Sequence, residues 1–97
     1  MIYLNVYLTV KKPEDVEKVR GLLTEQGRLS LQEPGCRRFE VYHSQNDHRV
    51  FILSEHWASQ ADLDRHREAL AYTTIYKPQV IPLVDRVPHP SNLVGSE

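Results

Sequence analysis

Residues 2–10, IYLNVYLTV, alternate aliphatic side chains at even positions with polar or aromatic side chains at odd positions. This period of two, in residues of high β propensity, predicts a strand that buries one face. Residues 38–43 and 49–57 also have extended patterns, and the turn-forming stretch SQND at 44–47 separates them. The two segments are therefore predicted to form a hairpin. A last strand is expected over residues 80–87.

Two helices are predicted between these strands. Pro13 suits the first turn of a helix over residues 13–32, which Gly27 weakens and Glu33-Pro34-Gly35 ends. The second helix is predicted over residues 59–71, with Ser59 as N-cap and with Leu63, His66 and Leu70 on its inward face.

The segments around Pro78 and Pro82 are less regular. Residues 72–77 fit either a strand or a further helical turn, and Pro78 is expected to end that segment in both cases. Pro82 lies inside the last expected strand, which favours an edge position or a bulge.

The order βαββαβ predicts a ferredoxin-like α+β fold, a four-stranded antiparallel sheet with two helices on one face. The other face would carry Tyr3, Tyr7, Val50 and Ile52, which are too apolar to remain exposed to water. A homodimer that pairs sheet to sheet is therefore expected.

Composition limits the class of protein. The 97 residues suit one domain, with a core over about 2–87 and a C-terminal tail at 88–97. The net charge of −1 disfavours nucleic acid as a partner, and no apolar stretch is long enough for a membrane span, so a cytoplasmic protein is expected. The single cysteine, Cys36, excludes an internal disulfide and is expected to be an inert thiol.

Three patches carry a resemblance to a known family. They are Glu33-Pro34-Gly35-Cys36, then Glu55 and Trp57 at the end of a strand, then Ala61, Leu63, Asp64 and His66 on a helix. In this order they resemble the antibiotic biosynthesis monooxygenase (ABM) family. The resemblance implies a dimeric α/β barrel, in a family that includes cofactor-independent quinol and anthrone oxygenases, haem-degrading enzymes and a phospho-sugar isomerase.

Haem and metal cofactors are not expected. Haem-degrading relatives take their axial ligand from a histidine late in the second helical segment, and no histidine occurs between Arg67 and Arg86. The five histidines also form no H-x-H or H-x-x-x-H pair for a metal ion.

His66 is the candidate catalytic residue, because an inward imidazole can accept a proton near neutral pH. The alternative role is a structural hydrogen bond between helix and sheet. Trp57 is a candidate wall for an aromatic substrate, although a lone tryptophan in a small domain is also a normal core residue. The further candidate substrate-binding residues are Glu55, Asn5, Tyr72 and Tyr76.

Glu55 and Asn5 also have a structural interpretation, and Tyr72 and Tyr76 are candidate lid or gating residues. Glu55 would serve equally in a structural ion pair, and Asn5 would equally hydrogen-bond across a dimer interface. Tyr72 and Tyr76 lie where a segment would close over a pocket between helix and sheet.

The leading hypothesis is a homodimeric, cofactor-independent monooxygenase that oxidises a small phenolic or quinol-type aromatic with O₂. One alternative is a non-catalytic dimeric barrel, such as a stress-associated module, that binds a small hydrophobic molecule. Another is an isomerase of a small carbonyl compound. A phosphorylated substrate would have only Arg65 and Arg67 to meet it, which argues against that branch of the family.

Overall fold

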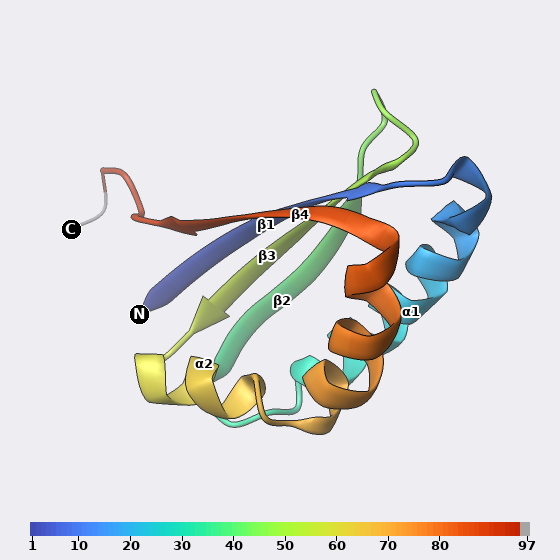
Figure 1. The fold of residues 1–97 in the computed structure, drawn as a ribbon. Coiled ribbons are helices and arrows are strands. Elements are labelled where there is room, and N and C mark those ends of the chain that lie inside the picture. Colours follow the sequence, from blue (N-terminus) through green and yellow to red (C-terminus); the bar gives the residue numbers. More distant parts are fainter. Residues whose placement is uncertain (96–97) are drawn as a thin grey trace.

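The computed structural model describes residues 1–95 and places four antiparallel strands in one sheet. The strands are β1 (Ile2–Val10), β2 (Cys36–His43), β3 (Val50–Trp57) and β4 (Val84–Ser91), in the order β2-β3-β1-β4. The helix α1 (Val16–Ser30) and the helical segment η2 (Ala71–Val80) pack side by side on one face of this sheet (Figure 1). The predicted ferredoxin-like α+β fold is confirmed.

The core lies between the sheet and these helices. Its β1 residues are the even-numbered ones, as the alternation predicts, and Leu4, Val6, Leu8 and Val10 are each at most 5% exposed. On β3 the same face carries Phe51, Leu53, Glu55 and Trp57, all buried. The register of β1 and β3 therefore places alternate residues of both strands in one buried layer.

The other face of the sheet carries a row of apolar side chains that crosses all four strands. Tyr42 of β2 pairs with Ile52 of β3, Ile52 with Tyr7 of β1, and Tyr7 with Val87 of β4. Tyr7, Tyr42 and Val87 are each about half exposed, at 46%, 46% and 51%. No helix covers this face within residues 1–95 (Figure 1).

The first helical segment begins with a short 3₁₀ turn, η1 (Pro13–Asp15), and continues as α1 to Ser30, two residues before the expected end. It runs without a break through Gly27. A Cβ atom at this position would lie 3.6 Å from Cδ1 of Phe39, so the glycine sits where α1 approaches β2 closely.

The second helix is shorter than predicted. It spans α2 (Gln60–His66) and not residues 59–71, because the amides of Glu68 and Ala69 bond back three residues, to the carbonyls of Arg65 and His66. These tight turns rotate the following residues off the inward face. The prediction that Leu70 is buried was wrong, since this side chain is 73% exposed.

Pro78 does not end the next segment, which was also predicted wrongly. Residues 71–80 form the π-helical segment η2, with Pro78 inside it. In a π-helix each amide donates to the carbonyl five residues back, so Pro78 leaves the carbonyl of Thr73 without that donor. The side chain of Gln79 donates from Nε2 to the carbonyl of Thr74 at 2.9 Å, and the helical segment continues across the proline.

The last strand is displaced from its expected position. Residues 81–83 form the 3₁₀ turn η3 (Ile81–Leu83), which contains Pro82, and β4 extends to Ser91 instead of ending at residue 87. The expected edge position is confirmed. Pro88 and Pro90, two residues apart, both lack the amide hydrogen on the same side of this edge strand, so they are compatible with pairing to β1 on the other side.

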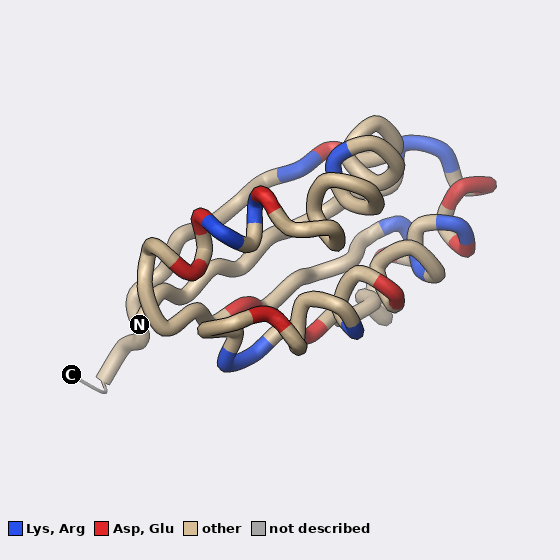
Figure 2. The backbone as a smooth tube through the Cα atoms, turned by 90° about the horizontal axis from the view of Figure 1, so that it is seen from below, with Lys and Arg blue, Asp and Glu red and all other residues tan. Residues whose placement is uncertain are grey.

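Lys and Arg residues are interspersed with Asp and Glu residues along the helices and loops of the described chain (Figure 2). Within residues 1–95, no helix combines the length and apolar character needed to cross a lipid bilayer.

Candidate functional site

His66 is the last residue of α2, and its side chain points into the interior. Ser59 is the N-cap of this helix, as the sequence predicts. Its side chain accepts a hydrogen bond from the amide of Asp62. The His66 residue is only 3% exposed. An imidazole buried to this degree needs a hydrogen-bond partner.

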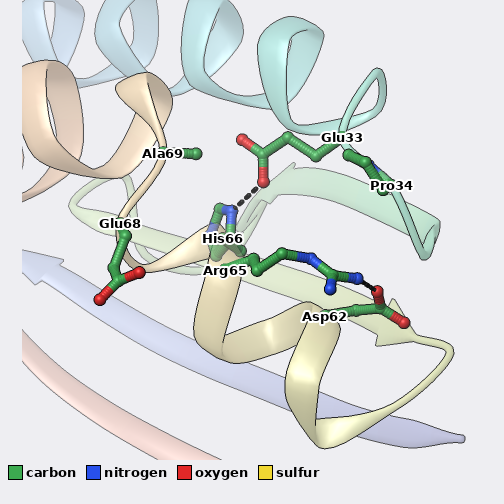
Figure 3. Close-up of a pocket in the computed structure, with 7 residues that line it drawn as sticks. All are labelled: Glu33, Pro34, Asp62, Arg65, His66, Glu68 and Ala69. Carbon is green, nitrogen blue, oxygen red and sulfur yellow. Dashed lines mark hydrogen bonds and ion pairs between the residues drawn. The ribbon is translucent and has the colours of Figure 1, made fainter.

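That partner is Glu33. A hydrogen bond of 2.6 Å joins Nδ1 of His66 to Oε1 of Glu33, and Figure 3 shows the carboxylate reaching down from the turn after α1 to meet the ring. Because Nδ1 is engaged, Nε2 is the ring nitrogen left for other chemistry.

The turn that carries Glu33 is fixed against α2. Gly35 has a φ of 80°, and a Cβ atom there would overlap the side chain of Asp62. The carbonyl of Gly35 accepts a hydrogen bond of 2.8 Å from the amide of Ala58, just before α2. Only glycine satisfies both the left-handed backbone and the close approach, which explains its place in the Glu33–Cys36 patch.

Three aromatic rings surround His66. Its ring centroid lies 4.5 Å from that of Trp57, 5.8 Å from that of Phe39 and 5.7 Å from that of Tyr72. Trp57 is fully buried, and Tyr72 is half-buried beside it on η2. The imidazole of His66 is therefore packed among aromatic side chains, and of these three rings only that of Tyr72 is partly exposed.

Burial changes the proton affinities of this dyad in opposite directions. Desolvation raises the pKa of Glu33 from 4.5 to about 7 and lowers the pKa of His66 below its ordinary 6.5. The carboxyl group of Glu33 therefore keeps its proton to a higher pH than a free glutamic acid, and the imidazole of His66 stays neutral to a lower pH than a free histidine. A neutral imidazole hydrogen-bonded to such a carboxyl group is suited to general acid–base chemistry.

Glu55 lies deeper in the same layer. It is 4% exposed and accepts a hydrogen bond of 3.0 Å from Nε1 of Trp57. Burial raises its pKa, while the Trp57 bond and the nearby positive charges, among them Arg86, act against this rise. Its direct partner is therefore the tryptophan that the sequence placed on the same side of β3.

Tyr76 is fixed in the interior. Its hydroxyl accepts a hydrogen bond of 2.7 Å from Nε of Arg86, whose guanidinium also lies 5.8 Å from the centre of the tyrosine ring. Burial raises the pKa of Tyr76 to about 12, so the phenol keeps its proton. Its ring lies 5.2 Å from that of Tyr72, which connects Tyr76 to the aromatic wall around His66.

Asn5 is the candidate residue that the structure does not bring to this cluster. It lies on the other face of the sheet, because odd-numbered residues of β1 point away from the helices. There its side chain accepts a hydrogen bond from Ser54 at 3.2 Å and donates one to Ser91 at 3.1 Å.

A cavity of about 300 Å³ opens beside the dyad. Its lining consists of Glu33, Pro34, Asp62, Arg65, His66, Glu68 and Ala69 (Figure 3). Arg65 is paired with Asp62, and the carboxylate of Glu68 points away from His66. Acidic groups outnumber basic ones at this opening, which makes it unfavourable to a phosphorylated ligand.

Cys36 follows the Glu33 turn but offers little nucleophilic character. Burial raises the pKa of its thiol to about 11, and the nearby Glu33 adds to this effect. The thiol therefore stays protonated near neutral pH, in line with an inert cysteine.

Two residues of the site were not predicted as such, namely Glu33 and Phe39. Glu33 stands in the Glu33–Cys36 patch, and the signal that could have identified it is a carboxylate directly before a Pro-Gly turn that returns the chain to the sheet. Phe39 is in the alternating pattern of β2, on the side that pairs with Glu55.

The described residues contain no group of three or more His, Cys, Asp or Glu side chains that could hold a metal ion together.

Comparison with known proteins gives a consistent result. The model of the family described as antibiotic biosynthesis monooxygenase matches residues 1–77. A candidate antibiotic biosynthesis monooxygenase from Nitrosomonas europaea is 25% identical, with a TM-score of 0.87, over 97% of this chain and 99% of that one. A crystal structure of an antibiotic biosynthesis monooxygenase is also 25% identical, with a TM-score of 0.88 and the same coverage.

A conserved protein of unknown function from Bacteroides thetaiotaomicron shares the fold at 24% identity and a TM-score of 0.86, over 95% of this chain and 96% of that one. No curated protein matches the sequence significantly.

Proposed function

Because the chain belongs to the antibiotic biosynthesis monooxygenase family, we propose that it oxidises a small phenolic or quinol-type aromatic with O₂, using no cofactor. The observation that carries this proposal is the hydrogen bond between Glu33 and His66 at the edge of a cavity of about 300 Å³. A base that borders a cavity is what deprotonation of a bound phenol requires.

In the first step, Nε2 of His66 takes the proton of the substrate hydroxyl. Glu33 accepts a hydrogen bond from Nδ1–H and stabilises the imidazolium that forms. The resulting phenolate is electron-rich, and in this proposal the half-buried ring of Tyr72, next to His66, shields it from water. Reduced hydration favours its reaction with oxygen.

In the second step, the phenolate transfers one electron to O₂, and the two radicals combine to form a carbon–oxygen bond at the position opposite the original hydroxyl. The imidazolium of His66 returns its proton to the peroxide. Loss of the ring C–H proton and cleavage of the O–O bond then give the quinone and one water. Overall, one phenol and one O₂ give one quinone and one water, so the substrate supplies all four electrons.

The stoichiometry of this scheme can be measured directly. Purified protein is incubated in air with a panel of phenols, quinols and anthrones, with oxygen uptake as the readout and metal analysis of the same preparation. Uptake of one O₂ per quinone formed, without a stoichiometric metal, supports the proposal. Tight binding of the same compounds without oxygen uptake would instead indicate a binding module.

We also propose that the protein is a homodimer that pairs sheet to sheet. Support comes from the uncovered row Tyr42, Ile52, Tyr7 and Val87, which crosses all four strands. A domain of this size gains core volume when a second copy covers such a row. The hydrogen-bonded chain of Ser54, Asn5 and Ser91 would then lie within the interface.

A further inference from the structure

Asp62 is a buried acidic residue of the cavity lining that the proposed reaction does not use. It is 9% exposed and lies in the first turn of α2. One carboxylate oxygen, Oδ2, accepts a hydrogen bond of 2.8 Å from Oγ of Ser59, and the other, Oδ1, pairs with the guanidinium of Arg65 (Figure 3). Both oxygens are therefore engaged, and the side chain is held in one position.

The same side chain lies against the turn that carries Glu33. Gly35 of this turn has a φ of 80°, and a Cβ atom at residue 35 would overlap Cγ and Oδ2 of Asp62. The Asp62 carboxyl group thus fills the space in which every residue except glycine has its side chain. The turn therefore rests directly on this carboxyl group.

The turn is short, so its contact with Asp62 also places Glu33. The amide of Cys36 donates a hydrogen bond of 3.2 Å to the carbonyl of Glu33, which closes the turn around Pro34 and Gly35. The amide of Glu33 donates to the carbonyl of Ser30 at 3.0 Å. A shift of Gly35 is therefore transmitted to Glu33, two residues earlier in the chain.

The turn meets α2 at two points. Gly35 contacts Asp62, and the carboxylate of Glu33 bonds His66. Asp62 and His66 are four positions apart, about one helical turn, so they lie on the same face of α2. The first contact therefore sets how closely the Glu33 carboxylate approaches the imidazole at the second.

We propose that Asp62 is a positioning residue for the acid–base pair, and that its size holds the turn at the distance from α2 at which Glu33 bonds Nδ1 of His66. This rests on the proposed function, in which that bond stabilises the imidazolium of His66. The charge of Asp62 is already paired with that of Arg65, so the space that the side chain fills is its effect on the turn.

The test compares variants that change either the size or the charge of residue 62. Asp62→Ala removes the carboxyl group on which Gly35 rests, whereas Asp62→Asn removes the charge and keeps the size. The control is Asp64→Asn, which removes an exposed carboxylate of the same helix that bonds Gln60. A urea midpoint shows whether each variant is folded. Gly35→Ala disturbs the same contact from the side of the turn and takes the place of Asp62→Ala if that protein does not fold.

The first readout needs no substrate. The carbon-13 NMR signal of the His66 ring, identified by its absence from His66→Ala, is followed across the pH range. In the wild type it should report the ionisation of Glu33, because burial raises the pKa of this hydrogen-bonded carboxyl group to about 7. Asp62→Ala and Gly35→Ala should lose this inflection, because a displaced carboxyl group regains water and its pKa falls toward 4.5. Asp62→Asn and Asp64→Asn should keep it.

The second readout is kcat/KM for oxygen uptake. Asp62→Ala should lower it about tenfold, as is expected for Glu33→Gln, because the imidazolium loses the same partner. In a protein that already carries Glu33→Gln, Asp62→Ala should have no further effect, because Asp62 acts through Glu33.

The inference is overturned if Asp62→Ala keeps the inflection near pH 7, or if Asp62→Asn loses it, because charge and not size would then be responsible. It is also overturned if Asp62→Ala lowers kcat/KM equally with and without Glu33→Gln. A wild type that consumes no oxygen rejects the oxygenase, and the NMR titrations still decide the role of Asp62.

Discussion

Oε1 of Glu33 and Nδ1 of His66 lie 2.6 Å apart, although 33 positions separate the residues in the sequence. The contact joins the turn after α1 to the end of α2. It exists because Gly35 lets that turn lie directly on Asp62 of α2. The acid–base pair therefore depends on how two segments that are distant in the sequence pack together.

The rate of the proposed oxygenase should depend on the ionisation of Glu33. Below its pKa of about 7, Glu33 carries a proton and donates it to Nδ1, which leaves the proton of the neutral imidazole on Nε2. Above that pKa, the carboxylate accepts from Nδ1–H, and Nε2 is free to act as a base. We expect kcat/KM to rise as the pH rises through about 7.

The variant Glu33→Gln separates this dependence from that of His66. Its amide cannot ionise, so the inflection should move to the pKa of His66, below 6.5, and the plateau should fall about tenfold or more because no carboxylate stabilises the imidazolium. The measurement is kcat/KM from oxygen uptake across the pH range. If the pH profile of kcat/KM has the same inflection in Glu33→Gln as in the wild type, Glu33 does not position His66 for catalysis.

Glu33 should also affect stability. Its folded-state pKa is raised above 4.5 to about 7, so the folded protein favours the protonated carboxyl, and the wild type loses stability as the pH rises through about 7. Glu33→Gln has no such loss. Its free energy of unfolding, relative to that of the wild type, should therefore be about 1–3 kcal/mol higher at pH 8 than at pH 4. Urea unfolding at both pH values measures this.

Glu25→Gln is the matched control for that comparison. Glu25 is an exposed carboxylate whose pKa is lowered by its hydrogen bond to Arg28, so its removal should give no such gain. A gain of equal size in both variants would show that the effect is general to the charge of α1 and its turn.

Trp57→Ala should destabilise the fold by about 3–5 kcal/mol, because the ring is fully buried and leaves a large cavity. Trp57→Phe keeps a buried six-membered ring and loses the bond to Glu55 together with a smaller volume, so a smaller loss of about 1–3 kcal/mol is expected. Urea unfolding of both variants distinguishes the two contributions. A loss of under about 1 kcal/mol in Trp57→Ala would contradict the buried position of the ring.

Much of the fold could be predicted from the sequence, because a strand such as β1 records its two faces as a strict alternation. The errors fall where local rules were overridden. Tight turns end α2 at His66, and the π-helical segment continues past Pro78 with a side-chain hydrogen bond from Gln79 to the carbonyl of Thr74, so the last strand starts later. These effects depend on individual hydrogen bonds that periodicity does not record.

The site was predicted in part for a similar reason. His66 and Trp57 lie on elements whose inward faces can be read from spacing, and the structure brings them within 4.5 Å. Glu33 lies in a turn, where the direction of a side chain follows from the packing of Gly35 on α2 and not from a period. Asn5 was grouped with the site although the alternation of β1 places it on the opposite face.

The proposed dimer should have twice the 11.3 kDa mass of one chain at micromolar concentration. Ile52→Lys places a charge in the middle of the apolar row between Tyr42 and Tyr7, and should give a folded protein of 11.3 kDa. The control Leu31→Lys changes an exposed side chain after α1 and should leave the dimer intact. Sedimentation equilibrium measures all three, and a wild type of single-chain mass contradicts the proposal.

The most direct test of the central claim is the rate of oxygen uptake by His66→Ala on the best substrate, with a urea midpoint measured on the same preparation. If His66 is the base, kcat/KM falls by about 10²–10⁴ while the protein stays folded, and His48→Ala, in the distant hairpin turn, retains full activity. A folded His66→Ala protein with unchanged oxygen uptake would contradict the account, and it would leave His66 as a structural hydrogen-bonding residue between α2 and the Glu33 turn.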